Sequence, residues 1–320
     1  MRTYLIRRLL LIIPTLILVS MLVFLTVRLI PGKVIDQMVA QRPMGGGIGS
    51  QIDVEALRHM LGLDQSIPVQ YGKWIADMFR GNFGKSLWTN LELMDEIGAR
   101  MPITFELGLM AFIIAQIIAI PIGIYSAVRQ DSIGDFLGRS FAILALSVPS
   151  FWLGRMIMVF PSIWWGWSPP MSYTRFSEDA WTNLGQFILP AVLLGLSMSG
   201  TTMRMLRTTM LEVLRQDYIR TAWAKGLRER IVVVRHSLRN SLIPVVTIIS
   251  GQIPVMIGGA VIIEQIFNLP GMGRLFLDSI NTRDYPFVTG INMFLAVVGL
   301  FLILLTDMSY AYLDPRIRYR

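Results

Sequence analysis

The chain has 320 residues, of which 53% are hydrophobic and only 16% are charged. Soluble domains carry about 25% charged residues, so this composition excludes an ordinary soluble domain and indicates a protein embedded in lipid. No cysteine and only two widely separated histidines, His59 and His236, exclude a disulfide framework and a Cys/His metal site. The net charge of +8 does not indicate a nucleic-acid partner, because the basic residues lie beside apolar runs without an aromatic-basic pattern.

The first apolar run predicts an uncleaved membrane span. Arg2, Arg7 and Arg8 precede the run Leu9–Ile30, which is longer than the 7–15 apolar residues of a signal peptide. No small-residue cleavage site follows it. We therefore expect residues 1–30 to form a first transmembrane helix with a cytoplasmic N-terminus.

Residues 31–102 are expected to form a large extracytoplasmic segment. This part contains a glycine-rich loop at Gly45-Gly46-Gly47 and mixed helical patterns around Val54–Leu63 and Val69–Phe79.

Residues 103–309 contain five further apolar runs and are expected to form a permeation core. A bilayer core about 30 Å thick requires about 20 mostly apolar helical residues. The runs are Ile103–Val128, Phe136–Ile163, Phe187–Met205, Leu242–Phe267 and Val288–Ser309. The fold class predicted is therefore an all-α membrane protein with six transmembrane helices.

The distribution of charge predicts the orientation of these spans. With the N-terminus in the cytoplasm, the inner segments hold most of the 29 basic residues but only a third of the 21 acidic residues. Cytoplasmic loops carry this excess of Lys and Arg. Both ends, including the tail 310–320, are therefore expected in the cytoplasm.

Several polar residues in or near the expected spans have two interpretations each. Arg155 lies in the third run, where a cation marks a functional site unless it snorkels to the interface. Ser197, Ser199 and Thr201 suit either helix contacts or a water-lined substrate path. Glu106 and Glu264, at the outer ends of runs, suit either solvated helix caps or ligands, and the cap is the favoured interpretation.

Residues 212–244, here called the basic segment, carry the most informative pattern. Apolar residues at helical spacing, from Leu211 to Trp223, predict one amphipathic helix that ends at Gly226. Ile231, Val234, Leu238 and Leu242 predict the apolar stripe of a second helix. Such an element can pack on its own spans, lie on anionic headgroups or dock into a partner's groove. The pattern alone leaves all three open.

The basic segment resembles the cytoplasmic coupling loop of ABC importer permeases, in the form of the dipeptide, oligopeptide and nickel branch. The matching motifs run through the whole chain: Arg28-Leu29-Ile30-Pro31-Gly32, Gly84-Lys85-Ser86, Tyr218-Ile219-Arg220-Thr221-Ala222, Ala224-Lys225-Gly226-Leu227, Leu238-Arg239-Asn240, Leu242-Ile243-Pro244, Asn268-Leu269-Pro270-Gly271-Met272-Gly273-Arg274, Arg283-Asp284-Tyr285-Pro286 and Leu313-Asp314-Pro315-Arg316. The chain departs from the branch at Trp223, a common basic position, and at Lys33-Val34, commonly Asp-Pro.

This resemblance implies a type I ABC importer permease in the cell inner membrane. It would pair with a second, homologous permease, two cytoplasmic ATPase subunits that use ATP and Mg, and an external binding protein that delivers di- or oligopeptides. The chain itself would bind no cofactor, and it has no Walker motif and no catalytic residues. The residues implied in ATPase coupling are Tyr218, Arg220, Thr221, Ala222, Trp223, Lys225, Gly226, Leu227, Arg235, His236, Arg239 and Asn240.

Three other functions remain as alternatives. A permease for nickel or another small solute would share the same motifs. A secondary transporter would place charged pairs at mid-membrane, and a membrane-embedded enzyme would need clustered catalytic residues. Neither feature is evident in the sequence.

Overall fold

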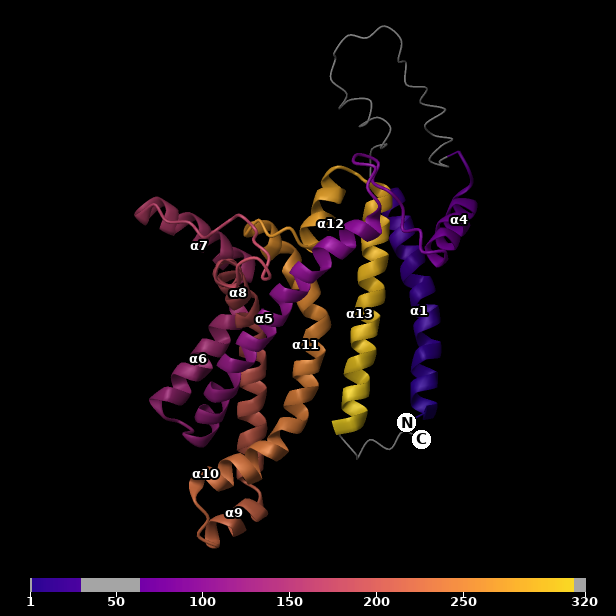
Figure 1. Ribbon diagram of the computed structural model, residues 1–320. Coiled ribbons are helices and arrows are strands. Elements are labelled where there is room, and N and C mark those ends of the chain that lie inside the picture. Colours follow the sequence, from indigo (N-terminus) through magenta and orange to yellow (C-terminus); the bar gives the residue numbers. More distant parts are fainter. Residues whose placement is uncertain (1, 30–63, 314–320) are drawn as a thin grey trace. The chain divides into compact units, whose positions relative to one another are not determined.

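Helices make up nearly all the regular structure in residues 2–29 and 64–313, which are the residues that the computed structural model describes (Figure 1). Within these ranges the only β-type pairing is an isolated bridge between Lys85 and Glu92, so the predicted all-α class is confirmed for the described chain. The helices are α1 (Arg2–Leu29), α4 (Ile67–Phe79), α5 (Leu93–Val128), α6 (Ile133–Ser147), α7 (Ser150–Trp165), α8 (Ala180–Leu214), α9 (Asp217–Ala224), α10 (Glu229–Ile231), the π-helix η1 (Val232–Leu238), α11 (Arg239–Ile266), α12 (Met272–Asn281) and α13 (Tyr285–Leu313).

Four of the described helices are long and apolar enough to cross a membrane. They are Leu93–Val128, Ala180–Leu214, Glu229–Pro254 and Tyr285–Met308, and they match four of the expected spans. The bent pair α6 and α7 gives a fifth if it counts as one span, and α1 contributes the shorter apolar stretch Leu10–Thr26. The helix expected around Val69–Phe79 is confirmed as α4, whereas Gly45–Gly47 and Val54–Leu63 lie outside the described residues.

The prediction of one continuous span over Phe136–Ile163 is wrong. Helix α6 ends at Ser147, α7 begins at Ser150, and the two helices differ in direction by 91°. Val148 and Pro149 have extended backbone angles between them. Proline disfavours the helical conformation of the residue before it and lacks an N–H of its own, so Val148-Pro149 breaks the helix.

The chain divides into two compact units, which are described separately. In the unit that includes Arg100–Arg274, helix α8 packs against α6, α7, α11 and η1. Glycines allow this close approach: a Cβ on Gly195 would lie 2.7 Å from the Ala111 carbonyl oxygen of α5, and one on Gly200 would lie 2.9 Å from that of Ala142 in α6. Small residues of this kind let membrane helices pack closely.

The second unit includes residues 64–99 and 275–300 together with α1. Helix α4 packs on α1 through the rings of Phe24, Tyr71 and Trp74, and the hydroxyls of Ser20 and Tyr71 lie 2.8 Å apart. In the same unit, the carboxylate of Asp284 accepts hydrogen bonds from the Ser86 hydroxyl at 2.5 Å and the Leu87 amide at 3.2 Å. Burial raises the pKa of Asp284, and these donors oppose the rise.

We expect Gly195→Ala to lower the stability of the protein, because the added methyl group would collide with the backbone of α5. Overpacking of this kind costs about 1–3 kcal/mol. Gly185→Ala in the same helix is the matched control, because a Cβ there meets nothing within 4 Å. Thermal unfolding of the detergent-purified protein measures the difference. Equal midpoints for the two variants would contradict the packing described for Gly195.

Candidate functional site

The basic segment begins where α8 breaks. Helix α8 ends at Leu214, and Gln216 takes an extended conformation with φ −74° and ψ 150°, as the residue before a new helix. The new helix, α9, has only eight residues, Asp217–Ala224. Figure 1 shows α9 and α10 at one end of α8 and α11. The basic segment therefore links the ends of two long apolar helices.

The end of α9 is set by Gly226, as the sequence predicts. Gly226 has φ +73°, which a side chain disfavours, and a Cβ there would meet nothing within 4 Å. Its N–H donates to the Trp223 carbonyl at 2.9 Å, and the Leu227 N–H donates to the Ala222 carbonyl at 3.4 Å. These bonds satisfy carbonyl groups that the helix end leaves free, so glycine is required for the backbone conformation and not for space.

A small apolar cluster holds α9 in place. Ile219, Ala222 and Val232 are buried together, and Val213, Leu214 and Leu227 are packed against them. These residues come from the end of α8, from α9, from the turn that follows α9 and from η1. The cluster therefore fixes α9 to the ends of both long helices rather than leaving it in a free loop.

Ala222 is buried in this cluster and Leu227 is half-buried against it, so both side chains make contacts within the chain, and their part in ATPase coupling stays a prediction. Ile219, which is 0% exposed, was not singled out, although its i, i+3 spacing to Ala222 is the relevant signal. Exposed residues of α9 include Tyr218, Arg220, Thr221 and Trp223, with Lys225 directly after the helix, and these five are here called the α9 face; Tyr218 is 44% and Trp223 45% exposed.

The predicted stripe of the second helix is wrong in part. Ile231 and Val234 are exposed, whereas Val232, Val233 and Ser237 are buried. Residues 232–238 form a π-helix, whose wider turns change which residues share a face. Leu238 and Leu242 are half-buried against Leu206, Met210 and Val245, as the stripe predicts.

Polar contacts join α9 to the start of α11. The Asn240 side-chain amide donates to the Tyr218 hydroxyl at 2.8 Å and to the His236 carbonyl at 3.2 Å. The structure thus brings together three of the residues that the resemblance implies in coupling. The basic side chains Arg220, Lys225, Arg235 and Arg239 are exposed, with Arg220 3.4 Å from Asp217.

The candidates for a substrate path do not form one cluster. Ser199 is fully buried and donates to the Leu196 carbonyl at 2.6 Å, and Ser197 and Thr201 donate to carbonyl groups of the same helix at 3.4 Å. Their hydroxyls are therefore used within α8. Arg155 is exposed on α7.

A polar contact in the middle of the bundle was not predicted. The Gln252 side-chain amide in α11 donates to the Met198 carbonyl of α8 at 3.2 Å and contacts the Thr202 hydroxyl. Gln252 has no sequence neighbour that signals this role.

The interpretation of Glu264 as a solvated cap is wrong. Glu264 is fully buried and accepts hydrogen bonds from the Thr104 hydroxyl at 2.6 Å and from the amides of Gly273 and Arg274 at 2.8 and 3.1 Å. It therefore caps the start of α12 from within the protein. A Cβ on Gly271 would lie 2.3 Å from the Glu264 carboxyl carbon, so the Pro-Gly-Met-Gly turn must keep this glycine.

The sequence is similar to known transport proteins over its full length. Residues 119–319 match the family described as binding-protein-dependent transport system inner membrane component, and residues 1–108 match the N-terminal model of such components. A putative peptide transport system permease of Brucella abortus is 39% identical over 307 residues, 96% of each chain. The glutathione transport system permease GsiC of Pectobacterium atrosepticum is 38% identical, and that of Salmonella typhimurium 36% identical, each over 320 residues and 100% of both chains.

We expect Ile219→Ala to release α9 from its cluster. Ile→Ala substitutions in a core cost about 2–5 kcal/mol, which is enough to open a short helix locally. Trypsin should then cut after Arg220 and Lys225 at least about tenfold faster than in the unmodified protein. The matched control is Ile231→Ala, because Ile231 is 40% exposed. Equal cleavage rates in the two variants would show that Ile219 does not anchor α9.

Proposed function

The chain belongs to the family of binding-protein-dependent transport system inner membrane components and is a permease subunit without an ATPase of its own; from this premise we propose that it forms half of the translocation pathway of an ATP-driven peptide importer. In this proposal a second, homologous permease supplies the other half, an external binding protein delivers the peptide, and two ATPase subunits bind ATP and Mg. The relatives named for peptide and glutathione transport support small peptides as the substrate class.

The proposed topology has six spans in the inner membrane, with both ends and the basic segment in the cytoplasm. It combines the four long apolar helices, α1 and the bent pair α6 and α7. The excess of basic residues in the segments assigned to the inside supports this orientation. Trp181 near the start of α8 then lies on the opposite side of the membrane from α9, because a helix of 35 residues is about 50 Å long.

The observation that carries the proposal is the α9 face. Two half-exposed aromatic residues, Tyr218 and Trp223, and two exposed cations, Arg220 and Lys225, lie in or directly after a helix whose Ile219 and Ala222 are buried. Tyr, Trp and Arg are the residues that most often dominate binding at protein interfaces. We therefore assign the α9 face as the surface that docks into an ATPase subunit.

The way α9 is held suggests how docking could drive transport. The cluster of Ile219, Ala222 and Val232 joins α9 to the end of α8 and, through η1, to the start of α11. A partner that displaces α9 would therefore displace the ends of two spans together. Closure of the ATPase subunits on ATP would in this way change the access of the pathway between the two sides of the membrane.

We expect Tyr218→Ala with Trp223→Ala to separate the permease from its ATPase subunits. Loss of central aromatic contacts costs about 2 kcal/mol or more each, or about 4 kcal/mol for the pair, so affinity should fall roughly 500-fold or more. Co-purification of the ATPase subunits from detergent extracts measures this. The control is Trp181→Ala, an 85% exposed tryptophan at the far end of α8. Full retention of the ATPase subunits by the double variant would exclude the α9 face as their docking surface.

We expect Gly226→Pro to uncouple ATP hydrolysis from peptide uptake while the protein still inserts into the membrane. Proline fixes φ near −65°, opposite in sign to the +73° at Gly226, and removes the N–H that bonds to Trp223. Uptake of labelled peptide and release of phosphate are measured together in proteoliposomes that contain the complete transporter. Unchanged uptake in this variant would contradict the role of the Gly226 turn.

A further inference from the structure

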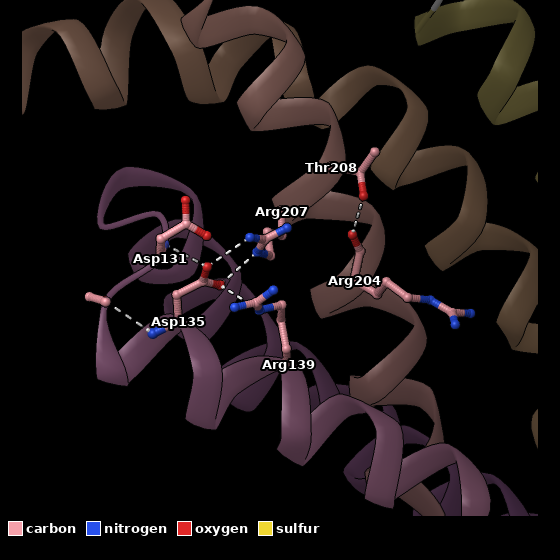
Figure 2. Close-up of polar contacts among 7 residues, drawn as sticks. Asp131, Asp135, Arg139, Arg204, Arg207 and Thr208 are labelled. Carbon is pink, nitrogen blue, oxygen red and sulfur yellow. Dashed lines mark hydrogen bonds and ion pairs between the residues drawn. The ribbon is translucent and has the colours of Figure 1, made fainter.

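A buried ion pair joins α6 to α8 at the end of these helices that leads to the basic segment. Figure 2 shows the carboxylate of Asp135 facing the guanidinium of Arg207. Arg207 Nε lies 2.7 Å from Asp135 Oδ1, and Arg207 Nη2 lies 2.7 Å from Oδ2. Two parallel bonds of this length give the pair a fixed relative orientation as well as a charge interaction.

The environment of Asp135 makes this pair different from a surface contact. The Asp135 side chain is 0% exposed and that of Arg207 is 16% exposed. Arg139 adds a weaker contact at 3.6 Å, and the Asp131 amide donates to Oδ2 at 3.0 Å. Removing one partner of a buried pair leaves an uncompensated charge and is strongly destabilising, so this contact between α6 and α8 requires both side chains.

The hairpin that carries Asp135 is rigid. Ser132 caps α6 by accepting from the Asp135 amide at 3.2 Å, and Asp131 has φ +62° in the tight turn. A Cβ on Gly138 would lie 2.5 Å from the Ser126 hydroxyl of α5, and one on Gly134 would lie 2.3 Å from the Tyr125 ring. The ends of α5 and α6 are therefore packed so closely that they would move as one body.

The same hairpin contacts the basic segment directly. Arg129, at the end of α5, lies 3.4 Å from Glu229 at the start of α10, with both side chains about half exposed. Arg207 itself lies on α8 two turns before its end at Leu214, where α9 follows. The hairpin is thus tied at two points to the elements that carry α9, by a buried pair and by an exposed pair.

We propose that Asp135 and Arg207 are positioning residues that transmit movement of the basic segment to the α5–α6 hairpin, so that four spans rather than two respond to the ATPase subunits. This inference rests on the proposed docking of the α9 face. The buried Asp135–Arg207 pair provides the main link between the hairpin and α8, because exposed ion pairs such as Arg129–Glu229 contribute little to stability. Asp135 and Arg207 have no part in binding the ATPase subunits in this account.

The test compares Asp135→Asn, Arg207→Gln and Arg207→Lys in the complete transporter. We expect the first two variants to keep their ATPase subunits and to hydrolyse ATP, but to take up about tenfold less peptide per ATP, because the buried pair is lost. Arg207→Lys keeps the charge without the two parallel bonds. Its peptide uptake per ATP should therefore lie between that of the first two variants and that of the unmodified protein. Arg204→Gln is the matched control, because Arg204 lies on the same helix and its side chain points away from Asp135 (Figure 2).

Normal uptake per ATP in Asp135→Asn and Arg207→Gln would overturn the proposal, and so would an equal loss in Arg204→Gln. Loss of ATPase subunits from these variants would also overturn it, because it would indicate a general structural defect. Failure of the docking proposal gives a different result, in which the variant Tyr218→Ala with Trp223→Ala keeps its ATPase subunits.

A distance measurement keeps the proposal testable if Asp135→Asn does not accumulate. The chain has no cysteine, so spin labels can be placed at the exposed positions 133 and 230 without other changes. In the unmodified transporter this distance should stay constant when a non-hydrolysable ATP analogue is added, because the two ends move together. In Arg207→Lys it should change. A change in the unmodified transporter would overturn the proposal.

Discussion

The burial of Ile219 against Ala222 and Val232 is the interaction on which the rest of this structure depends. It joins a short amphipathic helix to the ends of two long apolar helices. Without it, a partner that pulls on α9 would extend a loop and would not move a span. With it, displacement of α9 by a docked partner, as proposed above, would reach α8 directly and α11 through the π-helix. The remaining features of the basic segment, including the Gly226 turn and the contact between Asn240 and Tyr218, keep α9 in the same orientation.

Local signals in the sequence predicted the parts of the fold that depend on neighbouring residues. Apolar runs predicted the long helices, and Gly226 predicted the end of α9, because these features depend on residues that are neighbours in the chain. The break at Val148-Pro149 carries an equally local signal, but the apolar run across it is long enough to be taken for one span. The π-helix has no comparable signal, so the predicted stripe of Ile231 and Val234 failed.

The buried polar residues show why the rest of the site could not be predicted. Glu264 bonds to Thr104, which is 160 residues away in the chain, and Asp135 bonds to Arg207, which is 72 residues away. Whether a carboxylate in such a place is solvated or buried depends on partners that only the folded chain brings near. The same reason explains Ala222, which pattern alone could assign equally well to an internal cluster or to a partner's groove. Membrane helices tolerate buried charges only when such partners satisfy them.

The central claim is that the outward side of α9 contacts an ATPase subunit in the cytoplasm. Photo-crosslinking from a single cysteine at position 221, in a chain that is otherwise free of cysteine, tests it most directly. If α9 docks as proposed, position 221 gives an ATP-sensitive crosslink to an ATPase subunit and position 181, at the other end of α8, gives none. Labelling of position 221 only from the external side of intact cells, or equal crosslinking from the two positions, would contradict it.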